Sequence, residues 1–427
     1  MKKKGLILLV IIIIGFLAGC SGGKDITKEA FNIEVKDNVK SVNDEIFIST
    51  GDHNEINMTL VTSNDKAVLI DTGFKEKEAL KIKNIIKEKN LKLDKIIISH
   101  FDDEQLNNLG MFKQENTEIL MPQNIKNEQI VEIGDKKLKL LLTNGHNSNG
   151  HISVDINNNI LVAGDILTTN KKSYTAVTYN EYEFLLESLK YLQKTNYELI
   201  IPGHGDIIKD NKFISKKIKE IENQLSKYDI KADKFWSEID DDIIVSSGNE
   251  YTIKKATMVL AISGKEATMI DTGITENMGK EMKKFIEEND LELKNLIITH
   301  DHYDHTNNLD MFNKEGVNLY TYDNSNDGDV IKCKDKEFKI IFTPGHAKNK
   351  HLSVLIDEKI FVAGDILASN IDPVRLVDTD EAGKIVINTL EKLNEKQYDI
   401  VIPGHGDVCL GNSVFNKNIE ILKRDFK

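Results

Sequence analysis

The sequence is poor in positive charge, cysteine and histidine, and each shortage narrows what the protein can be. Its 427 residues include 56 lysines and arginines against 69 aspartates and glutamates, which gives a net charge of −13. A protein that binds nucleic acid needs a basic face, so no nucleic-acid partner is expected. A small anionic substrate remains compatible, because the charges within a site decide what binds there. The length suits two domains.

The N-terminus carries an apolar run that is too short to span a bilayer comfortably. The run follows a basic start, and Leu17-Ala18-Gly19-Cys20 at its end resembles the lipobox of bacterial lipoproteins. The resemblance implies a signal peptide at 1–19, a lipidated Cys20 and a tether at 20–37; the net charge becomes −16 once three lysines are removed (−13 − 3). We therefore expect an extracytoplasmic protein held to the cell membrane by lipid. A plain secretory signal and an uncleaved anchor are the alternatives.

Only two cysteines, Cys333 and Cys409, remain after the lipobox. Export permits a disulfide. Nothing in the sequence brings these two residues together, so two separate thiols are predicted.

The chain repeats itself with a period of roughly 200 residues, which indicates a duplicated domain rather than a solenoid. Five motifs recur in the same order and with similar gaps, which chance does not produce. The pairs are 68–73 with 268–273, 97–100 with 297–300, 144–146 with 344–346, 162–167 with 362–367, and 201–206 with 402–407. They predict a first domain at 38–228 and a second at 236–427, which are expected to pack against each other.

Short β-rich runs alternate with helical runs in each copy. In the first copy we predict a hairpin from 58–62 and 67–71, and an amphipathic helix over 75–89. Further strands are predicted at 95–99, 137–143, 152–156, 160–163 and 197–201, with a second helix over 181–193. The apolar face of the first helix is predicted to consist of Leu80, Ile82, Ile85 and Ile86.

Histidine is scarce, and its distribution is not random. Ten of the eleven histidines lie in the recurring motifs or within five residues of one, and only His53 does not. In the second copy the motif residues follow predicted strands, where a rigid scaffold can hold metal ligands. Imidazole and carboxylate groups favour zinc, with iron and manganese as alternatives. Seven candidates exceed the needs of one tetrahedral ion and divide into two sites that share a carboxylate: His300, His302, Asp304, His305, His346, Asp365 and His405.

This array, His300-x-His302-x-Asp304-His305 with His346, Asp365 and His405, resembles the metallo-β-lactamase fold superfamily, which includes glyoxalase II, lactonases and class B β-lactamases. The resemblance covers each copy nearly end to end. It implies an α+β fold, a four-layer αββα sandwich, in two copies in tandem. It also implies two divalent ions in the second copy. One is held by His300, His302 and His346, the other by Asp304, His305 and His405, and Asp365 bridges them.

Two close cations would lower the pKa of a shared water and generate hydroxide, which attacks a carbonyl, phosphoryl or sulfuryl centre. We therefore predict a metal-dependent hydrolase whose small-molecule substrate the fold does not identify. Asp304 is expected to orient the nucleophile or accept a proton. Asp271 either orients a ligand histidine or only ends a strand. His351 and its counterpart His151 are expected to be structural, and Tyr303 to pack rather than contact substrate.

The first copy keeps part of the ligand array. His100, His146, Asp165 and His204 remain, but Asp102, Glu104 and Gln105 stand where the second copy has His302, Asp304 and His305. In one interpretation His100, His146 and Asp165 hold a single metal ion, with Asp102 or Glu104 as a possible further ligand. In the other the domain binds no ion and persists as a scaffold.

Three functions follow from these alternatives. They are hydrolysis in the second domain alone, hydrolysis in both domains, and a metal- or ligand-binding lipoprotein without turnover. Structural zinc sites are usually four-coordinate and closed, so a complete dinuclear set favours catalysis.

Overall fold

The computed structural model describes residues 31–426 except 51–55, 148, 171–173, 211, 233–235, 247–255, 370 and 378. The predicted signal peptide at 1–19, the lipidation site Cys20 and most of the predicted tether lie outside this range. Within the described part, no helix is both long enough and apolar enough to cross a membrane.

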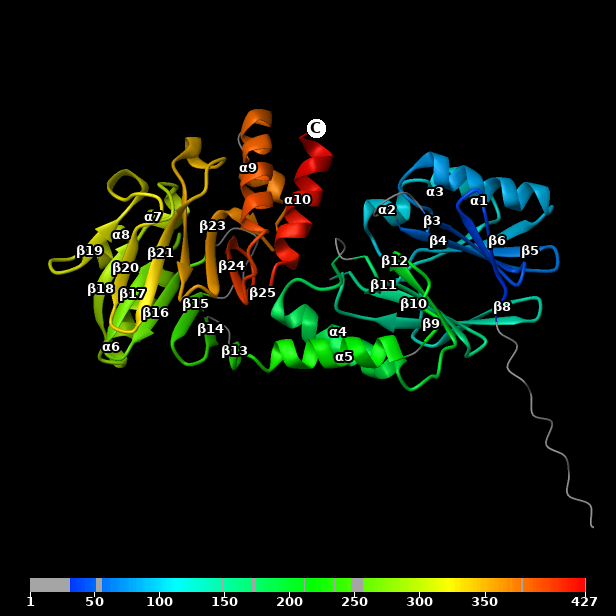
Figure 1. The fold of residues 1–427 in the computed structure, drawn as a ribbon, viewed down its shortest axis with the longest axis horizontal. Helices are drawn as coiled ribbons and strands as arrows, with labels where there is room; N and C mark the ends of the chain where they lie inside the picture. The colour runs from blue at the N-terminus through cyan, green and yellow to red at the C-terminus, as the bar shows by residue number, and fades with distance from the viewer. Residues whose placement is uncertain are drawn as a thin grey trace, which may run out of the picture.

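The first half consists of two sheets packed face to face, with helices on both outer sides (Figure 1). Side chains from both sheets, such as Val61 and Val154, meet in one hydrophobic cluster. The first sheet contains β1 (Ile33–Lys36), β2 (Val39–Val42), β3 (Ile46–Thr50), β4 (Asn57–Ser63), β5 (Lys66–Ile70), β6 (Lys92–Ile97) and β7 (Glu118–Leu120), in that order. The second sheet contains β8 (Gln129–Ile133), β9 (Lys136–Thr143), β10 (His151–Ile156), β11 (Ile160–Thr168) and β12 (Leu199–His204). Its strands lie side by side in the order β12-β11-β10-β9-β8. The helices are α1 (Glu76–Glu88), α2 (Asp103–Leu106), α3 (Leu109–Phe112), α4 (Tyr179–Leu192) and α5 (Lys212–Leu225).

The second half has the same four-layer plan. Its first sheet contains β13 (Ile230–Ala232), β14 (Trp236–Ile239), β15 (Ile243–Ser246), β16 (Val259–Ser263), β17 (Glu266–Ile270), β18 (Glu292–Ile297) and β19 (Asn318–Tyr320). Its second contains β20 (Val330–Cys333), β21 (Lys336–Phe342), β22 (Leu352–Ile356), β23 (Ile360–Ala368), β24 (Ile400–His405) and β25 (Cys409–Leu410). The helices are α6 (Glu276–Glu288), α7 (Tyr303–Thr306), α8 (Leu309–Phe312), α9 (Asp380–Leu393) and α10 (Ser413–Asp425), with 3-10 turns η1 (Tyr322–Asn324), η2 (Ala347–Asn349) and η3 (Pro373–Leu376). The same fold therefore occurs twice along the chain.

Two strands lie outside the predicted domain boundaries. β1 occupies the end of the segment that we expected to be a tether, and it pairs antiparallel with β2. β13 lies in the segment expected to connect the domains, and it pairs with β14 at the edge of the second-half sheet. Both strands are short, with four and three residues, and each lies at the edge of its sheet, where short strands are common. Runs of three or four residues carry too little periodicity to be distinguished from a linker.

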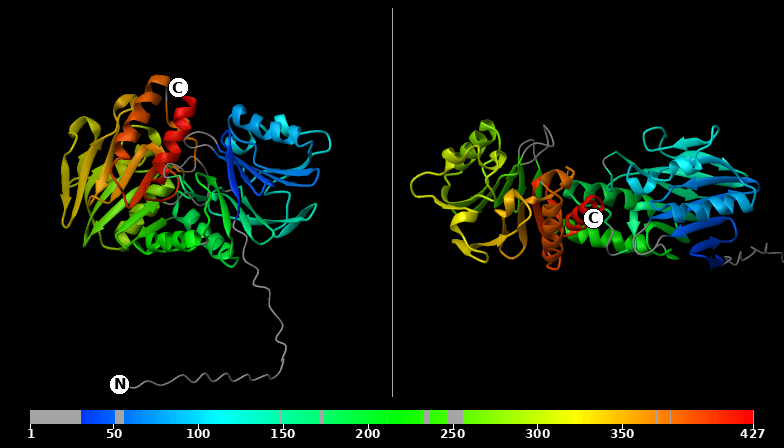
Figure 2. Two further views of the ribbon diagram at one scale, coloured as in Figure 1. Left: turned by 45° about the vertical axis from the view of Figure 1, so that its right-hand side comes forward. Right: turned by 90° about the horizontal axis from the view of Figure 1, so that it is seen from above.

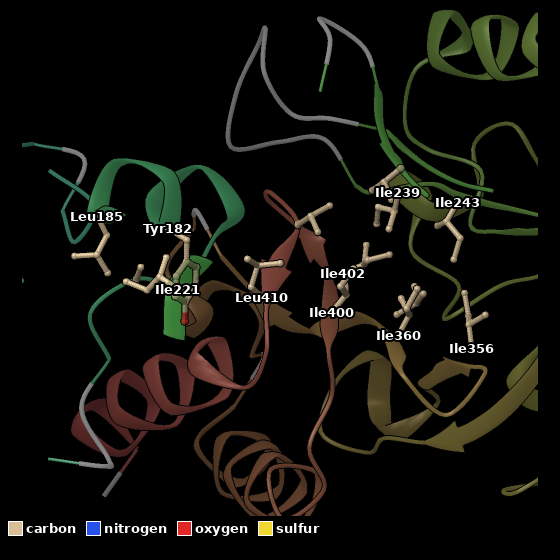
Figure 3. Close-up of a cluster of buried hydrophobic side chains, with 14 of the residues drawn as sticks. Tyr182, Leu185, Ile221, Ile239, Ile243, Ile356, Ile360, Ile400, Ile402 and Leu410 are labelled. Carbon is tan, nitrogen blue, oxygen red and sulfur yellow. The ribbon is translucent and has the colours of Figure 1, made fainter. Parts of the chain in front are cut away.

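The two halves share a hydrophobic core. Leu185 and Ile221 of the first half belong to the same cluster of buried side chains as Leu410 and Ile402 of the second (Figure 3). Backbone hydrogen bonds join the halves at the same place, from Tyr179 N to Val408 O (3.0 Å) and from Leu410 N to Val177 O (3.1 Å). Apolar burial and backbone pairing therefore both hold the halves together.

Cys333 and Cys409 are free thiols, which confirms the prediction of two separate cysteines. Both are buried, with 3% and 0% of the residue exposed. Burial also raises the pKa of the Cys409 thiol, which further depletes the reactive thiolate. We expect iodoacetamide to label both residues at least about a hundredfold more slowly in the native protein than in urea, because reaction needs an exposed thiolate. Peptide mass spectrometry measures this, and rapid native labelling of Cys409 would contradict the buried interface.

Candidate metal centres

The seven candidate ligands of the second half lie at one end of its two sheets. From the first sheet, His300 follows β18, His302 precedes α7, and Asp304 and His305 lie on α7. From the second sheet, His346 follows β21, Asp365 lies within β23, and His405 ends β24. Segments far apart in the sequence therefore bring their polar side chains to one edge of the sandwich.

Four of these side chains form a first group. Their ligating atoms all lie within 4.8 Å of one another, in His300, His302, His346 and Asp365. His346 Nε2 is 3.3 Å from His300 Nε2 and 3.1 Å from His302 Nδ1. Asp365 Oδ2 is 3.7 Å from His300 Nε2 and 3.6 Å from His346 Nε2. Three imidazole nitrogens and a carboxylate oxygen thus face one position.

A second group shares Asp365 with the first and adds Asp304, His305 and His405. His305 Nε2 is 3.1 Å from Asp365 Oδ1, and His405 Nε2 is 3.3 Å from Asp365 Oδ2. Asp304 Oδ2 is 3.4 Å from His405 Nε2. The structure therefore brings all seven predicted ligands of the second half together, in two groups that meet at one carboxylate.

The chemistry of these donors fits divalent cations. Burial and the neighbouring imidazoles hold the pKa of His300 well below its usual value, so this ring is neutral, the form that binds metal. His305 Nε2 and Asp365 Oδ1 are buried and make no hydrogen bond. A buried polar atom without a partner is costly, and ring nitrogens that face one another repel unless a cation lies between them. Imidazole and carboxylate donors suit zinc, iron and manganese.

Asp271, which follows β17, positions two of the candidate ligands. Its Oδ2 accepts hydrogen bonds from His305 Nδ1 (2.8 Å) and from Thr299 Oγ1 (2.8 Å), and Thr299 Oγ1 lies 3.0 Å from His300 Nδ1. A hydrogen bond at one ring nitrogen aims the other nitrogen at the metal position. Of the two roles left open by the sequence, the geometry favours that of orienting a histidine. We did not predict a role for Thr299, although Ser99, which also carries a hydroxyl group, stands at the equivalent position of the first half.

His351 holds the backbone of the shared aspartate. Its Nε2 accepts a hydrogen bond from Asp365 N (3.0 Å), and its Nδ1 lies 2.7 Å from Thr343 Oγ1. The close approach requires Gly364, where a Cβ would lie 2.6 Å from His351 Nε2 and where φ is +59°. His151, Gly164 and Asp165 repeat this arrangement in the first half, with 3.1 Å from Asp165 N to His151 Nε2. The expectation that both histidines are structural agrees with these contacts.

Tyr303 does not pack as expected. It is 68% exposed, because α7 is a single turn at the edge of the sandwich and its first residue points away from the sheets. The second-half groups are therefore flanked by an exposed aromatic side chain.

The first half brings its six candidate ligands together at the equivalent place. His100, Asp102 and His146 form one group, and Glu104, Asp165 and His204 form the other. His204 Nε2 is 3.1 Å from Glu104 Oε1 and 3.2 Å from Asp165 Oδ2. The first half therefore keeps two donor groups with altered donors, but Asp165 belongs to only one of them, whereas Asp365 belongs to both groups of the second half.

The loss of the histidine equivalent to His305 leaves a defect in the first half. Gln105 takes its position, is 0% exposed, and has neither amide atom in a hydrogen bond. Asp71, the counterpart of Asp271, has no imidazole partner there, and burial raises its pKa to about 7 against the opposing effect of the Ser99 backbone N–H. The first half thus retains one compact group and a weakened second one.

A cavity of about 220 Å³ lies beside the first-half site, lined mainly by first-half residues and by Ser413 of the second half. Tyr174 and Thr175 line it, and the Thr175 carbonyl lies 3.0 Å from His146 Nδ1. None of its lining residues belongs to the second-half groups.

Comparison with known proteins agrees with this geometry. Residues 51–118 and 254–320 each match the family model described as the metallo-beta-lactamase superfamily. A hydroxyacylglutathione hydrolase of Pseudoalteromonas translucida is 30% identical over 115 residues, which cover 24% of this chain and 42% of that protein. A thioesterase, pkgB, of Emericella nidulans is 23% identical over 159 residues, which cover 35% and 45%. The chain thus spans less than half of the length of these two relatives.

Among solved structures, a metallo-beta-lactamase from Pontibacter korlensis is 14% identical, with a TM-score of 0.37 over 46% of this chain and 99% of that one. The likeness to the superfamily therefore rests on the two matched segments. Each half of the chain contains a segment that matches the metallo-beta-lactamase superfamily, and both halves have the metallo-β-lactamase fold.

Proposed function

We propose that the second half is a metal-dependent hydrolase, and that the protein is anchored by lipid on Cys20 outside the cytoplasm. The observation that supports hydrolysis is the pair of donor groups that share Asp365. The anchoring is supported by the sequence of residues 1–20 alone. Two cations bound at these groups would lower the pKa of a water and polarise the bond that it attacks. The metal is expected to be zinc, with iron or manganese as alternatives.

The side chains of the site divide the work. Asp271 and His351 fix the ligand histidine and the shared aspartate, so that the groups keep their geometry when substrate arrives. Asp304 is the most accessible member of the second group, with 26% of its side chain exposed against 0–8% for the others. Although burial acts in the other direction, His405 and His305 lower the pKa of Asp304. It is therefore ionised at neutral pH and able to accept the proton that an attacking water loses.

We propose thioesters as the substrate class. The relatives named above are a hydroxyacylglutathione hydrolase and a thioesterase, and a further relative of Aspergillus chevalieri, 25% identical over 177 residues, is an atrochrysone carboxyl ACP thioesterase. Because each match covers only part of those proteins, the chemistry they share is carried over, and their particular substrates are not.

The full chain, purified in detergent, tests this proposal against a panel of a generic acyl thioester, a lactone, a phosphodiester and a β-lactam. We expect thioester hydrolysis that a chelator abolishes and added zinc restores, because every step needs the bound cations. The His302→Ala variant should lose hydrolysis and metal together. An absence of chelator-sensitive turnover on all four substrates would refute the proposal in favour of a binding lipoprotein.

A further inference from the structure

The first half carries a donor group of its own, and its function goes beyond the proposed hydrolysis. We propose that the first half binds one divalent cation between His100, Asp102, His146 and Asp165, and that this site favours manganese relative to zinc more strongly than the second half does. Two imidazoles and two carboxylates would hold the ion.

Of the four donors, His100, Asp102 and His146 have ligating atoms within 4.8 Å of one another, and an oxygen of Asp165 faces the same two imidazole nitrogens. Asp102 Oδ2 is 3.4 Å from His100 Nε2 and 3.8 Å from His146 Nε2. Asp165 Oδ2 is 3.7 Å from the first of these nitrogens and 3.5 Å from the second. Replacement of an imidazole by a carboxylate makes the set richer in oxygen, and oxygen ligands shift preference towards manganese.

Buried atoms in this group lack the partners that a folded protein normally provides. His100 is 0% exposed, yet its Nε2 makes no hydrogen bond, and the same holds for Asp165 Oδ1. Both atoms belong to the proposed ligands. A cation at the shared position would give the ring nitrogen the partner that the protein does not supply.

Asn147 fixes the side chain of Asp102, which stands where the second half has His302. Asn147 Nδ2 donates a hydrogen bond to Asp102 Oδ1 (3.0 Å), which leaves Oδ2 facing the two histidines. The second half has Ala347 directly after His346, where the first half has Asn147 directly after His146. A carboxylate held through one oxygen and presented through the other is arranged as a metal ligand. The first half therefore has a site with a different set of ligands, and not merely a copy of the second-half site that has lost some of its ligands.

The last helix of the second half, α10, covers this part of the first half. Arg424 Nη1 lies 2.8 Å from Asp103 Oδ2, next to Asp102 in the chain. Lys417 Nζ lies 6.0 Å from the centre of the Tyr174 ring, and that ring stacks on His146 at 5.6 Å. Figures 1 and 2 show α10 facing the end of the first half that carries α2. The second half thus places charged side chains beside the first-half site.

The alternative is an ion cluster that needs no metal. Burial opposes protonation of His100, but the nearby Asp102 and Asp165 carboxylates raise its pKa to about 9, so a proton could neutralise the group. Direct cation binding separates the two cases.

The test uses the full chain with His302→Ala and Asp304→Ala, which disables the second-half groups, and manganese chloride as the probe. Electron paramagnetic resonance counts bound Mn²⁺, and Trp236 fluorescence verifies the fold. We expect one bound ion per chain. Asp102→Asn should weaken its binding more than about tenfold, and Asn147→Ala by roughly tenfold, the usual effect of losing a residue that orients a ligand.

Asp103→Asn is the matched control, because it removes the same charge from the adjacent, exposed residue; its affinity should change less than about threefold at moderate salt. Asp102→His, which restores the second-half residue, should shift the zinc-to-manganese affinity ratio towards zinc by about tenfold or more. Absence of bound Mn²⁺, or equal losses for Asp102→Asn and Asp103→Asn, would overturn the site. An unchanged ratio in Asp102→His would overturn the preference. Because the second-half groups are disabled, neither result depends on hydrolysis.

Discussion

Replacement of Asp365 by asparagine is expected to abolish hydrolysis by the second half. Asp365 is the one residue shared by the two donor groups, with Oδ1 3.1 Å from His305 Nε2 and Oδ2 within 3.7 Å of three other histidines. The amide keeps the size of the side chain and removes its charge. Since loss of a residue that only orients a ligand costs roughly 10–100-fold, loss of a shared ligand should lower kcat/KM by more than about 100-fold. Metal analysis should show a parallel loss of bound ions.

Asp165→Asn, at the same position of the first half, is the informative comparison. It should lose manganese binding and leave kcat/KM close to that of the unmodified chain, because hydrolysis is assigned to the second half alone. If both variants lowered hydrolysis to a similar extent, the two halves would both be catalytic. If Asp365→Asn retained full activity and full metal content, the assignment of Asp365 would be wrong.

Replacement of Tyr182 by alanine is expected to destabilise both halves, although Tyr182 lies in the first. Its side chain is 8% exposed, lies in the cluster of buried residues that includes Leu410 of the second half, and its hydroxyl lies 3.2 Å from Ser413 Oγ (Figure 3). Truncation of a large buried aromatic residue lowers the free energy of unfolding by roughly 3–5 kcal/mol. Urea denaturation measures the change.

The single tryptophan makes this measurement specific. Trp236 lies in β14 of the second half, so its fluorescence reports the unfolding of that half. Tyr182→Ala should lower the urea midpoint of the Trp236 signal together with that of far-ultraviolet circular dichroism. Phe184→Ala on the same helix is the control, because Phe184 is 53% exposed and its loss should change stability by less than about 0.5 kcal/mol. An unchanged Trp236 midpoint in Tyr182→Ala would show that the halves unfold independently.

The candidate site could be predicted from the sequence because its ligands occupy the ends of strongly apolar strands. Wherever a buried strand ends, the next polar residues must lie at the edge of the sheet, so His300 and His346 were placed correctly. Asp365 and His405 lie inside β23 and β24, which extend further than predicted. The pairing of these two strands shifts register at Gly364 and continues beyond it. Such bulges depend on backbone geometry that residue periodicity does not record.

Other features depended on contacts between distant segments. Leu80 was predicted on the buried face of α1 but is 42% exposed, whereas Ile82 is fully buried. Residues two positions apart on an α-helix point about 200° apart around the helix axis, so the side chains of Leu80 and Ile82 cannot share a face. The hydrogen bond between Asn147 and Asp102 joins residues 45 positions apart, and the ion pair of α10 with Asp103 spans a far longer separation. Nothing in the local pattern predicts which polar residues will meet.

The core that continues from Leu185 to Leu410 also determines how natural selection acts on the first half. A substitution there that lowers stability by about 1–2 kcal/mol changes the amount of folded protein in a cell several-fold. Because the same core supports the second half, the cell would lose active sites in proportion. Selection on the interior of the first half therefore acts through the amount of folded second half, even at positions that never approach a ligand.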